Sequence, residues 1–326
     1  MVRLLSDDDV ERVLSLDELL PVVAEAFRKQ GAGDVERPPR PHFPVGSGLR
    51  SDDPLGTGLV MPAYLHGADT FATKVVAVHE ANAERGRPTV NAQITLTDAA
   101  DGRLVAQLAG NRITNARTGC IGGLAASSLA AAPVTLALVG AGTQARWQAR
   151  AIAAATSVSE IRVYSPSDSR EACASTLRDE LGVEAHAVES SAAAVAGANV
   201  VVTATTSPDP VVSAAAVDPG TLVVAVGAYT AEMQELPAAI VEAADRLYAD
   251  VPEEVAEVGD LRESSVPPSA LVPFSEVVDG VETVAPDELV VVESVGSAVL
   301  DAAAAEHVLD AAEADGLGTT VPFDEF

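Results

Sequence analysis

The stretch Val134-Thr-Leu-Ala-Leu-Val-Gly140-Ala-Gly142-Thr-Gln-Ala145 decides the fold of this 326-residue chain. An apolar run typical of a buried strand passes into the pattern G-x-G-x-x-A and then directly into a helix-forming segment. Gly140 permits a tight turn, Gly142 lets the backbone approach a pyrophosphate, and Ala145 allows close packing of helix on sheet. We therefore expect a dinucleotide at the N-terminus of this helix. The alternative interpretation is a tight structural turn between strand and helix.

The segments around this stretch predict an α/β fold. From residue 113 onwards, alanine-rich helical segments alternate with short apolar strands, which is typical of a parallel sheet covered on both faces. The strands expected there are 134–139, 161–164, 184–188, 199–205, 221–226 and 289–292, and a closing helix is expected from Ala298 to about Ala314. The preceding half predicts two helices within 6–30, capped by Ser6 and Ser15, and a mixed or antiparallel sheet from 58–64, 71–79, 91–98 and 104–109.

Charge and composition narrow the class of protein. The net charge is −28, from 48 acidic against 20 basic residues, and only two of the basic residues are lysines. This composition is typical of a protein from a high-salt cytoplasm, where salt screens the self-repulsion. A binder of basic partners is the weaker interpretation because the acids are scattered. An isoelectric point near 4.3 argues against nucleic acid as a partner.

The chain also predicts a soluble, cytoplasmic protein. No apolar run reaches the length of a membrane-spanning helix, and acids follow the N-terminus before any signal-peptide core can form. Cys120 and Cys173 both lie in alanine-rich helical contexts, so no disulfide framework is implied. We expect no metal site and no membrane partner.

Three cations form a candidate substrate site. Lys74 lies inside the apolar, β-branched run 70–78, where an ammonium loses hydration, so we expect it to be used. The alternative is that its stem packs on the sheet while its head reaches water. Arg117 falls near the start of a helix of small residues, where its guanidinium can clamp a carboxylate at two points or lie on the surface. With Arg40, these residues predict a site for an amino or keto acid.

The cofactor's 2′ position should be read about 20 residues after the glycine loop, at the end of the second strand. That segment reads Val163-Tyr-Ser165-Pro-Ser167-Asp-Ser-Arg170 and places no acid directly at the strand end. Ser165, Ser167 and Arg170 could hold a 2′-phosphate, which favours NADP slightly over NAD. A capped helix start is the alternative interpretation of the same residues.

Together, these residues resemble the ornithine cyclodeaminase/mu-crystallin family, which includes an archaeal type of alanine dehydrogenase and several ketimine reductases. The matching pieces cover almost the whole chain: Pro39-Arg40, Met61-Pro-Ala-Tyr64, Thr73-Lys74-Val-Val, Gly110-Asn-Arg-Ile-Thr114, Ala116-Arg117-Thr118, Gly140-Ala-Gly-Thr-Gln-Ala145, Met233-Gln-Glu235-Leu236, Glu257-Val-Gly259-Asp260 and Ser294-Val-Gly296-Ser297.

The resemblance implies a homodimer with two domains per chain: a substrate-binding and dimerisation domain of 1–114 and 298–326, and a Rossmann NAD(P)-binding domain of 115–297. It also implies that Arg40, Lys74 and Arg117 hold the substrate carboxylate beside the nicotinamide. The candidate cofactor-binding residues are then Thr118, Gly140, Gly142, Thr143, Gln144, Ala145, Ser165, Ser167, Arg170, Thr205, Gly227 and Ser297.

One departure from the family matters for the substrate. Where ornithine cyclodeaminases carry an aspartate that handles the substrate amine, this chain aligns Tyr229, although a shifted alignment would place Glu232 there. Tyr229 is therefore the fourth catalytic candidate, beside Arg40, Lys74 and Arg117. We expect an NAD(P)-dependent oxidoreductase that acts on the Cα–N bond of a small amino acid or imine, like the alanine dehydrogenases and ketimine reductases of the family. The alternatives are ornithine cyclodeaminase, a lyase that uses NAD catalytically, and a non-catalytic binding protein like mu-crystallin.

Overall fold

The computed structural model describes residues 1–280 and 284–323, except for the side chains of residues 83 and 84. The chain divides into two compact units, here called the first unit (1–117 with 298–326) and the second unit (118–297). Helix α3 (Gly110–Leu129) begins in the first unit and ends in the second.

The described part of the second unit (118–280 and 284–297) carries a parallel sheet in the order β10-β9-β8-β11-β12-β15-β13-β14. The strands are β8 (Val134–Val139), β9 (Val158–Tyr164), β10 (Glu184–Ala187), β11 (Val200–Thr203), β12 (Leu222–Ala225), β13 (Arg246–Ala249), β14 (Val272–Pro273) and β15 (Val290–Glu293). Every residue of β11, β12 and β15 is buried, as expected for strands covered on both faces. The predicted α/β class with a Rossmann-type sheet is confirmed.

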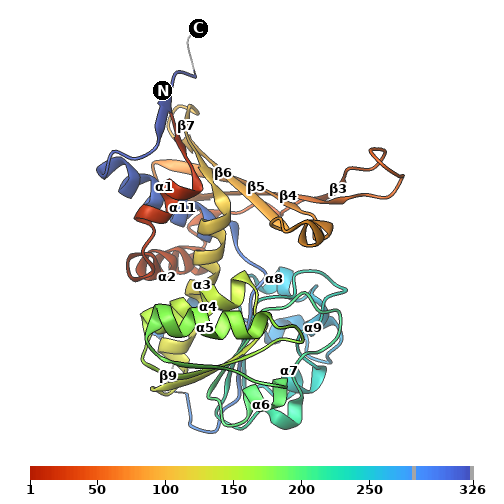
Figure 1. Ribbon diagram of the computed structural model, residues 1–326. Coiled ribbons are helices and arrows are strands. Elements are labelled where there is room, and N and C mark those ends of the chain that lie inside the picture. Colours follow the sequence, from red (N-terminus) through yellow and green to blue (C-terminus); the bar gives the residue numbers. More distant parts are fainter. Residues whose placement is uncertain (281–283, 324–326) are drawn as a thin grey trace. The chain divides into compact units, whose positions relative to one another are not determined.

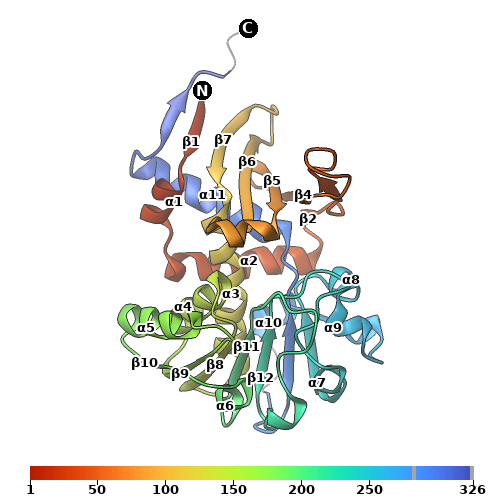
Figure 2. The ribbon, with the colours of Figure 1, turned by 45° about the vertical axis from the view of Figure 1, so that its right-hand side comes forward.

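The strand order reverses beside β8. The chain steps outward from β8 to β9 and β10 and then returns to β11 on the other side of β8 (Figure 2). At such a reversal the connections after the two central strands diverge, and ligands bind at the carboxyl ends there.

The helices of this unit are α4 (Thr143–Ala155), α5 (Ser169–Leu181), α6 (Ser191–Val195), α7 (Ala238–Ala243), α8 (Pro252–Val255), α9 (Gly259–Arg262) and α10 (Ser275–Gly280), with short 3₁₀ helices at Ala214–Ala216 and Pro268–Ala270.

The first unit is built on a mixed sheet in the order β16-β1-β7-β6-β5-β4-β2, with β3 also paired to β4. Its strands are β1 (Val2–Leu5), β2 (Val35–Glu36), β3 (His42–Val45), β4 (Gly56–Leu65), β5 (Thr70–Val78), β6 (Val90–Asp98), β7 (Leu104–Ala109) and β16 (Thr319–Val321). The antiparallel run β4 to β7 matches the expected strands. The terminal pair β1 and β16 was not predicted, because strands of three or four residues show no clear alternation.

Within the described residues, the helices that accompany this sheet besides the start of α3 are α1 (Asp7–Val13), α2 (Leu16–Ala32) and α11 (Ala298–Ala314), with a 3₁₀ helix at Glu80–Arg85. Helix α11 packs against β4, β5 and β6 and against α2 (Figure 1). Ser6 caps α1 in a reciprocal capping box with Asp9, as predicted. Ser15 precedes α2 but makes no side-chain capping hydrogen bond, so that expectation is wrong.

Among the helices in 1–280 and 284–323, none combines the length and apolar character needed to cross a bilayer.

Candidate active site

Lys74 lies on the buried face of β5. The alternation of this strand buries Ala72, Lys74 and Val76 and exposes Phe71 and Val75. The side chain of Lys74 is 2% exposed, so its ammonium does not reach water. A lysine held in this way must be satisfied from within the protein.

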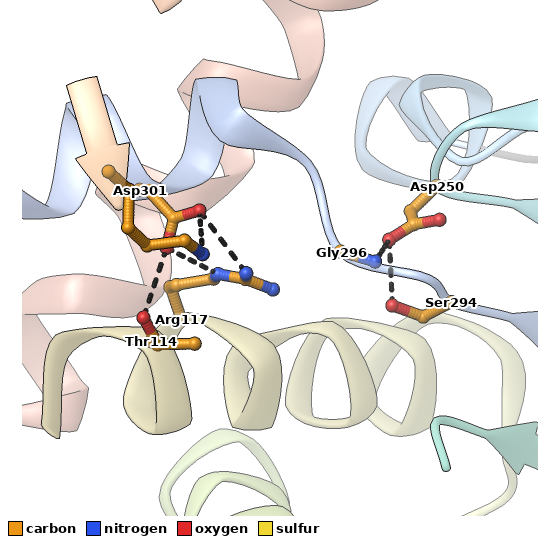
Figure 3. A network of polar contacts seen from close by, with 7 residues as sticks. Thr114, Arg117, Asp250, Ser294, Gly296 and Asp301 are labelled. Carbon is orange, nitrogen blue, oxygen red and sulfur yellow. Dashed lines mark hydrogen bonds and ion pairs between the residues drawn. The ribbon is translucent and has the colours of Figure 1, made fainter. Parts of the chain in front are cut away.

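Its partner is Asp301 in the first turn of α11. The Lys74 ammonium forms a buried ion pair with Oδ2 of Asp301. Arg117 engages the same carboxylate at two points, with Nε 3.0 Å from Oδ1 and Nη2 3.2 Å from Oδ2. Thr114, one turn earlier on α3, donates to Oδ1 at 3.4 Å. Figure 3 shows Arg117 and Thr114 pointing from α3 toward Asp301.

Two of the predicted catalytic residues are thus brought together within the first unit. Arg117 lies two turns into α3, and not near its start, because the helix already begins at Gly110. Asp301 was missed by the sequence reasoning. The available signal was a single acid among small apolar residues early in an alanine-rich helix, and α11 buries it completely.

Two cations of this cluster share one acid. The buried side chains of Lys74 and Arg117 both pair with the buried carboxylate of Asp301. Arg40 is half-buried and close enough for its charge to act on Lys74. Cationic side chains gathered in this way can bind an anion such as a substrate carboxylate.

The same environment adjusts proton affinities. Burial lowers the pKa of Lys74 to about 8, with Arg117 and Arg40 adding to this effect and Asp301 opposing it. Burial would raise the pKa of Asp301, but the charges and hydrogen bonds of Arg117 and Lys74 outweigh this effect and hold the pKa below its usual value. Lys74 can therefore exchange a proton near neutral pH while Asp301 stays ionised.

The second unit contains the glycine loop between β8 and α4. Gly140 adopts a positive φ of 118°, and a Cβ there would lie 2.5 Å from the carbonyl oxygen of Ala204. At Gly142, the N-cap of α4, a Cβ would meet no heavy atom within 4 Å, so the space beside the helix N-terminus is open. Ala145 is buried, as close packing of α4 requires.

The loop fits a dinucleotide by two observations. The open side of Gly142 and the N-terminus of α4 suit a pyrophosphate. Beside them, Nε2 of Gln144 is buried and has no hydrogen-bond partner among the described atoms. Thr143 is exposed as the first residue of the helix.

At the end of β9, the predicted 2′ site is a small polar cluster. Ser165 and Ser167 lie 3.3 Å apart through their hydroxyl oxygens, and Arg170 donates to the Ser165 carbonyl at 3.1 Å. Arg170 also pairs with the carboxylate of Glu189 at 3.1 Å. A 2′-phosphate would therefore compete with Glu189 for this guanidinium.

The remaining candidates lie on connections of the second unit. The carbonyl of Thr118 accepts a hydrogen bond from Nε2 of Gln148 at 2.9 Å. Thr205 and Gly227 follow β11 and β12, and Tyr229 is half-buried on the segment after β12. Ser297 is buried and ends the connection from β15 to α11.

Asp250 forms hydrogen bonds with the connection from β15 to α11. Its Oδ2 accepts from the Ser294 hydroxyl and from the Gly296 amide, both at 2.7 Å, and its Oδ1 accepts from Val295 N at 3.1 Å (Figure 3). Sequence reasoning quoted the Ser294–Ser297 motif but not the acid that orders it.

A doubly wound parallel sheet with an open glycine loop after its first strand defines a dinucleotide-binding class of protein. The chain belongs to the ornithine cyclodeaminase/mu-crystallin family, whose model matches residues 2–316.

Among similar proteins, the structure of Δ1-pyrroline-2-carboxylate reductase from Thermococcus litoralis, in complex with NADH and L-proline, is 30% identical with a TM-score of 0.91, covering 98% of this chain and 100% of that chain. An archaeal alanine dehydrogenase, a dimer with bound NAD, is 28% identical with a TM-score of 0.88 and 99% coverage of both chains. The ketimine reductase mu-crystallin of Rattus norvegicus is 31% identical over 94% of this chain and 96% of its own.

Proposed function

We propose that this protein transfers a hydride between a nicotinamide cofactor and the Cα of a small amino acid or imine that carries a carboxylate. The observation that supports this most strongly is the buried cluster of Lys74, Arg117 and Asp301. Dinucleotide binding alone does not require two buried cations on one carboxylate. The relatives described above are named for reactions of this class.

In this proposal the second unit holds the cofactor through the glycine loop, Gln144 and the connections after β9, β11 and β12. When bound, the cofactor supplies or accepts the hydride. We favour NADP slightly, because Ser165, Ser167 and Arg170 cluster at the end of β9 where no acid occupies the strand end. NAD is the alternative, and Glu189 is the residue that opposes a 2′-phosphate.

The first unit supplies the groups that act on the substrate. Arg117 and Arg40 neutralise its carboxylate, with Arg117 oriented by its two-point contact with Asp301. In the reductive direction, protonated Lys74 donates a proton toward the imine nitrogen. In the oxidative direction, neutral Lys74 accepts a proton from the substrate amine. A pKa of about 8 allows both forms near neutral pH.

We also propose a homodimer, as in the archaeal alanine dehydrogenase. The outer face of the first unit's sheet carries exposed apolar side chains at Phe71 and Val75, opposite the buried face that carries Lys74. Apolar sheet faces are commonly covered by association. The acidic composition fits a cytoplasm of high ionic strength, so oligomeric state should be measured by light scattering in molar salt.

The activity is tested by incubating the protein in molar salt with amino acids, with 2-oxo acids plus ammonia or methylamine, and with cyclic imines, using both cofactors. Net change in nicotinamide absorbance supports the proposal. Ammonia release from ornithine without net change supports the cyclodeaminase alternative. Cofactor binding without either reaction supports a binding protein and would overturn the proposal.

A further inference from the structure

Glu235 is a fully buried carboxylate that collects hydrogen bonds from two strand ends. Its Oε1 accepts from the Thr205 amide at 2.6 Å. Its Oε2 accepts from the Gly227 amide at 2.7 Å and from the Thr203 hydroxyl at 3.1 Å. The donors come from the end of β11 and from the connection after β12.

The connection after β11 packs tightly against both the glycine loop and the connection after β12. A Cβ at Gly227 would lie 2.1 Å from the Thr205 carbonyl oxygen and 2.6 Å from Oε1 of Glu235. A Cβ at Gly140 would lie 2.5 Å from the Ala204 carbonyl oxygen. The ends of β8, β11 and β12 therefore meet backbone against backbone, and Glu235 binds two of the three.

Glu235 is itself fixed by its main chain. The amides of Glu235 and Leu236 donate to Oδ1 of Asp260 at 2.7 and 2.9 Å. Asp260 is completely buried near the start of α9. The main chain of Glu235 is thus anchored to one buried acid, while its carboxylate binds the connections after β11 and β12.

Burial raises the pKa of Glu235, but the three groups that face its two oxygens are all donors, which favours the ionised form. Charged hydrogen bonds of this kind to backbone amides are strong. The connections after β11 and β12 lie on the side of β8 where the strand order reverses, which is where ligands of doubly wound sheets bind. A change at Glu235 would alter the conformation of both connections without replacing a residue of either connection.

We propose that Glu235 is a positioning residue for the dinucleotide, which holds the Thr205 and Gly227 connections in the conformation that the bound cofactor needs. This inference rests on the proposed dinucleotide binding. It assigns to Glu235 an effect on cofactor affinity that acts through the backbone.

The test is the variant Glu235→Gln, titrated with NADH and NADPH by fluorescence under conditions where circular dichroism shows it folded. Gln has the same shape, but its amide nitrogen must face either the Thr205 or the Gly227 amide, so one donor loses its acceptor. We expect the Kd for the cofactor to rise about 10- to 100-fold, the range of one charged hydrogen bond. In turnover assays the cofactor KM should rise by a similar factor while the substrate KM changes about twofold or less.

Two further variants keep the outcome decisive. Thr203→Val removes only the hydroxyl donor in a side chain of similar shape, so a rise of a few fold is expected, and this variant decides the matter if Glu235→Gln does not fold. Glu263→Gln removes an exposed charge from the same unit and should bind cofactor like the parent. The positioning role is overturned if the parent binds the cofactor and folded Glu235→Gln binds it equally well. If Glu235→Gln does not fold, the same result with Thr203→Val overturns the positioning role. A parent that binds neither cofactor overturns the proposed function itself.

Discussion

Arg117 and Asp301, 184 residues apart in the sequence, form a two-point ion pair in the interior of the first unit, with distances of 3.0 and 3.2 Å. Lys74 joins the same carboxylate from β5. An isolated buried ion pair often contributes little to stability because of its desolvation cost. Here a second cation is added to a single acid, which fits the proposed roles in carboxylate binding and proton transfer.

Lys74→Ala should lower kcat/KM by about two orders of magnitude or more, the range lost with a general acid or base, while NAD(P)H still binds. Steady-state kinetics and cofactor titration measure the two effects separately. The matched control is Lys29→Ala, since Lys29 is the only other lysine of the sequence and donates to the His66 carbonyl. Near-normal turnover of the Lys74 variant would contradict its assignment.

The pH dependence should follow the lowered pKa of Lys74, about 8. The oxidative reaction needs neutral Lys74, so its rate should rise as pH increases through about 8 and then level off. The reductive reaction needs the ammonium, so its rate should fall over the same interval. Initial rates in both directions across this range provide the measurement. Profiles that show no inflection near this value would contradict proton transfer by Lys74.

Asp301→Asn should destabilise the fold by about 3–5 kcal/mol, because removal of one partner leaves buried cations uncompensated. Denaturant unfolding at fixed salt measures this change. Since Asp301 opposes the lowering of the Lys74 pKa, its loss should also move the kinetic inflection to lower pH. An unchanged inflection in a folded variant would mean that Asp301 does not govern Lys74.

The helices and strands could be predicted from the sequence better than the side-chain contacts that form between them. The glycine loop, β8 and the strands β4 to β7 were predictable because each carries its own local pattern of apolar periodicity and turn residues. Lys74 and Arg117 were identifiable from charge in an apolar or small-residue context. Asp301 was not, because its role depends on α11 packing against β5, a contact that no local pattern encodes. Glu235 lies in a quoted motif, but its donors become visible only when β11 and β12 lie side by side.

Gly142→Val should abolish dinucleotide binding while leaving the fold intact. A side chain there enters open space, where the pyrophosphate is proposed to lie, and φ at this position is an ordinary −78°. Gly140→Val is the contrasting variant, because a Cβ at Gly140 collides with the Ala204 carbonyl and the backbone has a positive φ. Thermal unfolding and NADH titration should therefore separate a binding defect from a folding defect. Unchanged affinity in the Gly142 variant would mean that the loop is structural.

Glu189→Gln should strengthen NADPH binding by about twofold to fivefold and leave NADH binding unchanged. The substitution removes the carboxylate that pairs with Arg170, and the Glu189 side chain is 86% exposed, so the effect is modest. Titration of parent and variant with both cofactors at one salt concentration is the measurement. A parent that clearly prefers NADH, with no response to this substitution, would overturn the preference for NADP.

L-Ornithine should not be converted to proline at a useful rate. The resemblance aligns Tyr229 with the aspartate that handles the substrate amine in ornithine cyclodeaminases, and a phenol offers that amine one oxygen in place of a carboxylate. A protonated amine that enters a partly buried site needs a negative charge or several acceptors. Incubation with L-ornithine and NAD in high salt, followed by chromatography of ammonia and proline, tests this expectation.

Sustained proline formation would contradict this expectation and point to Glu232, which is exposed on the same segment. In that case Glu232→Gln should stop the reaction while Tyr229→Phe leaves it intact, and activity in both variants would exclude this segment from amine recognition.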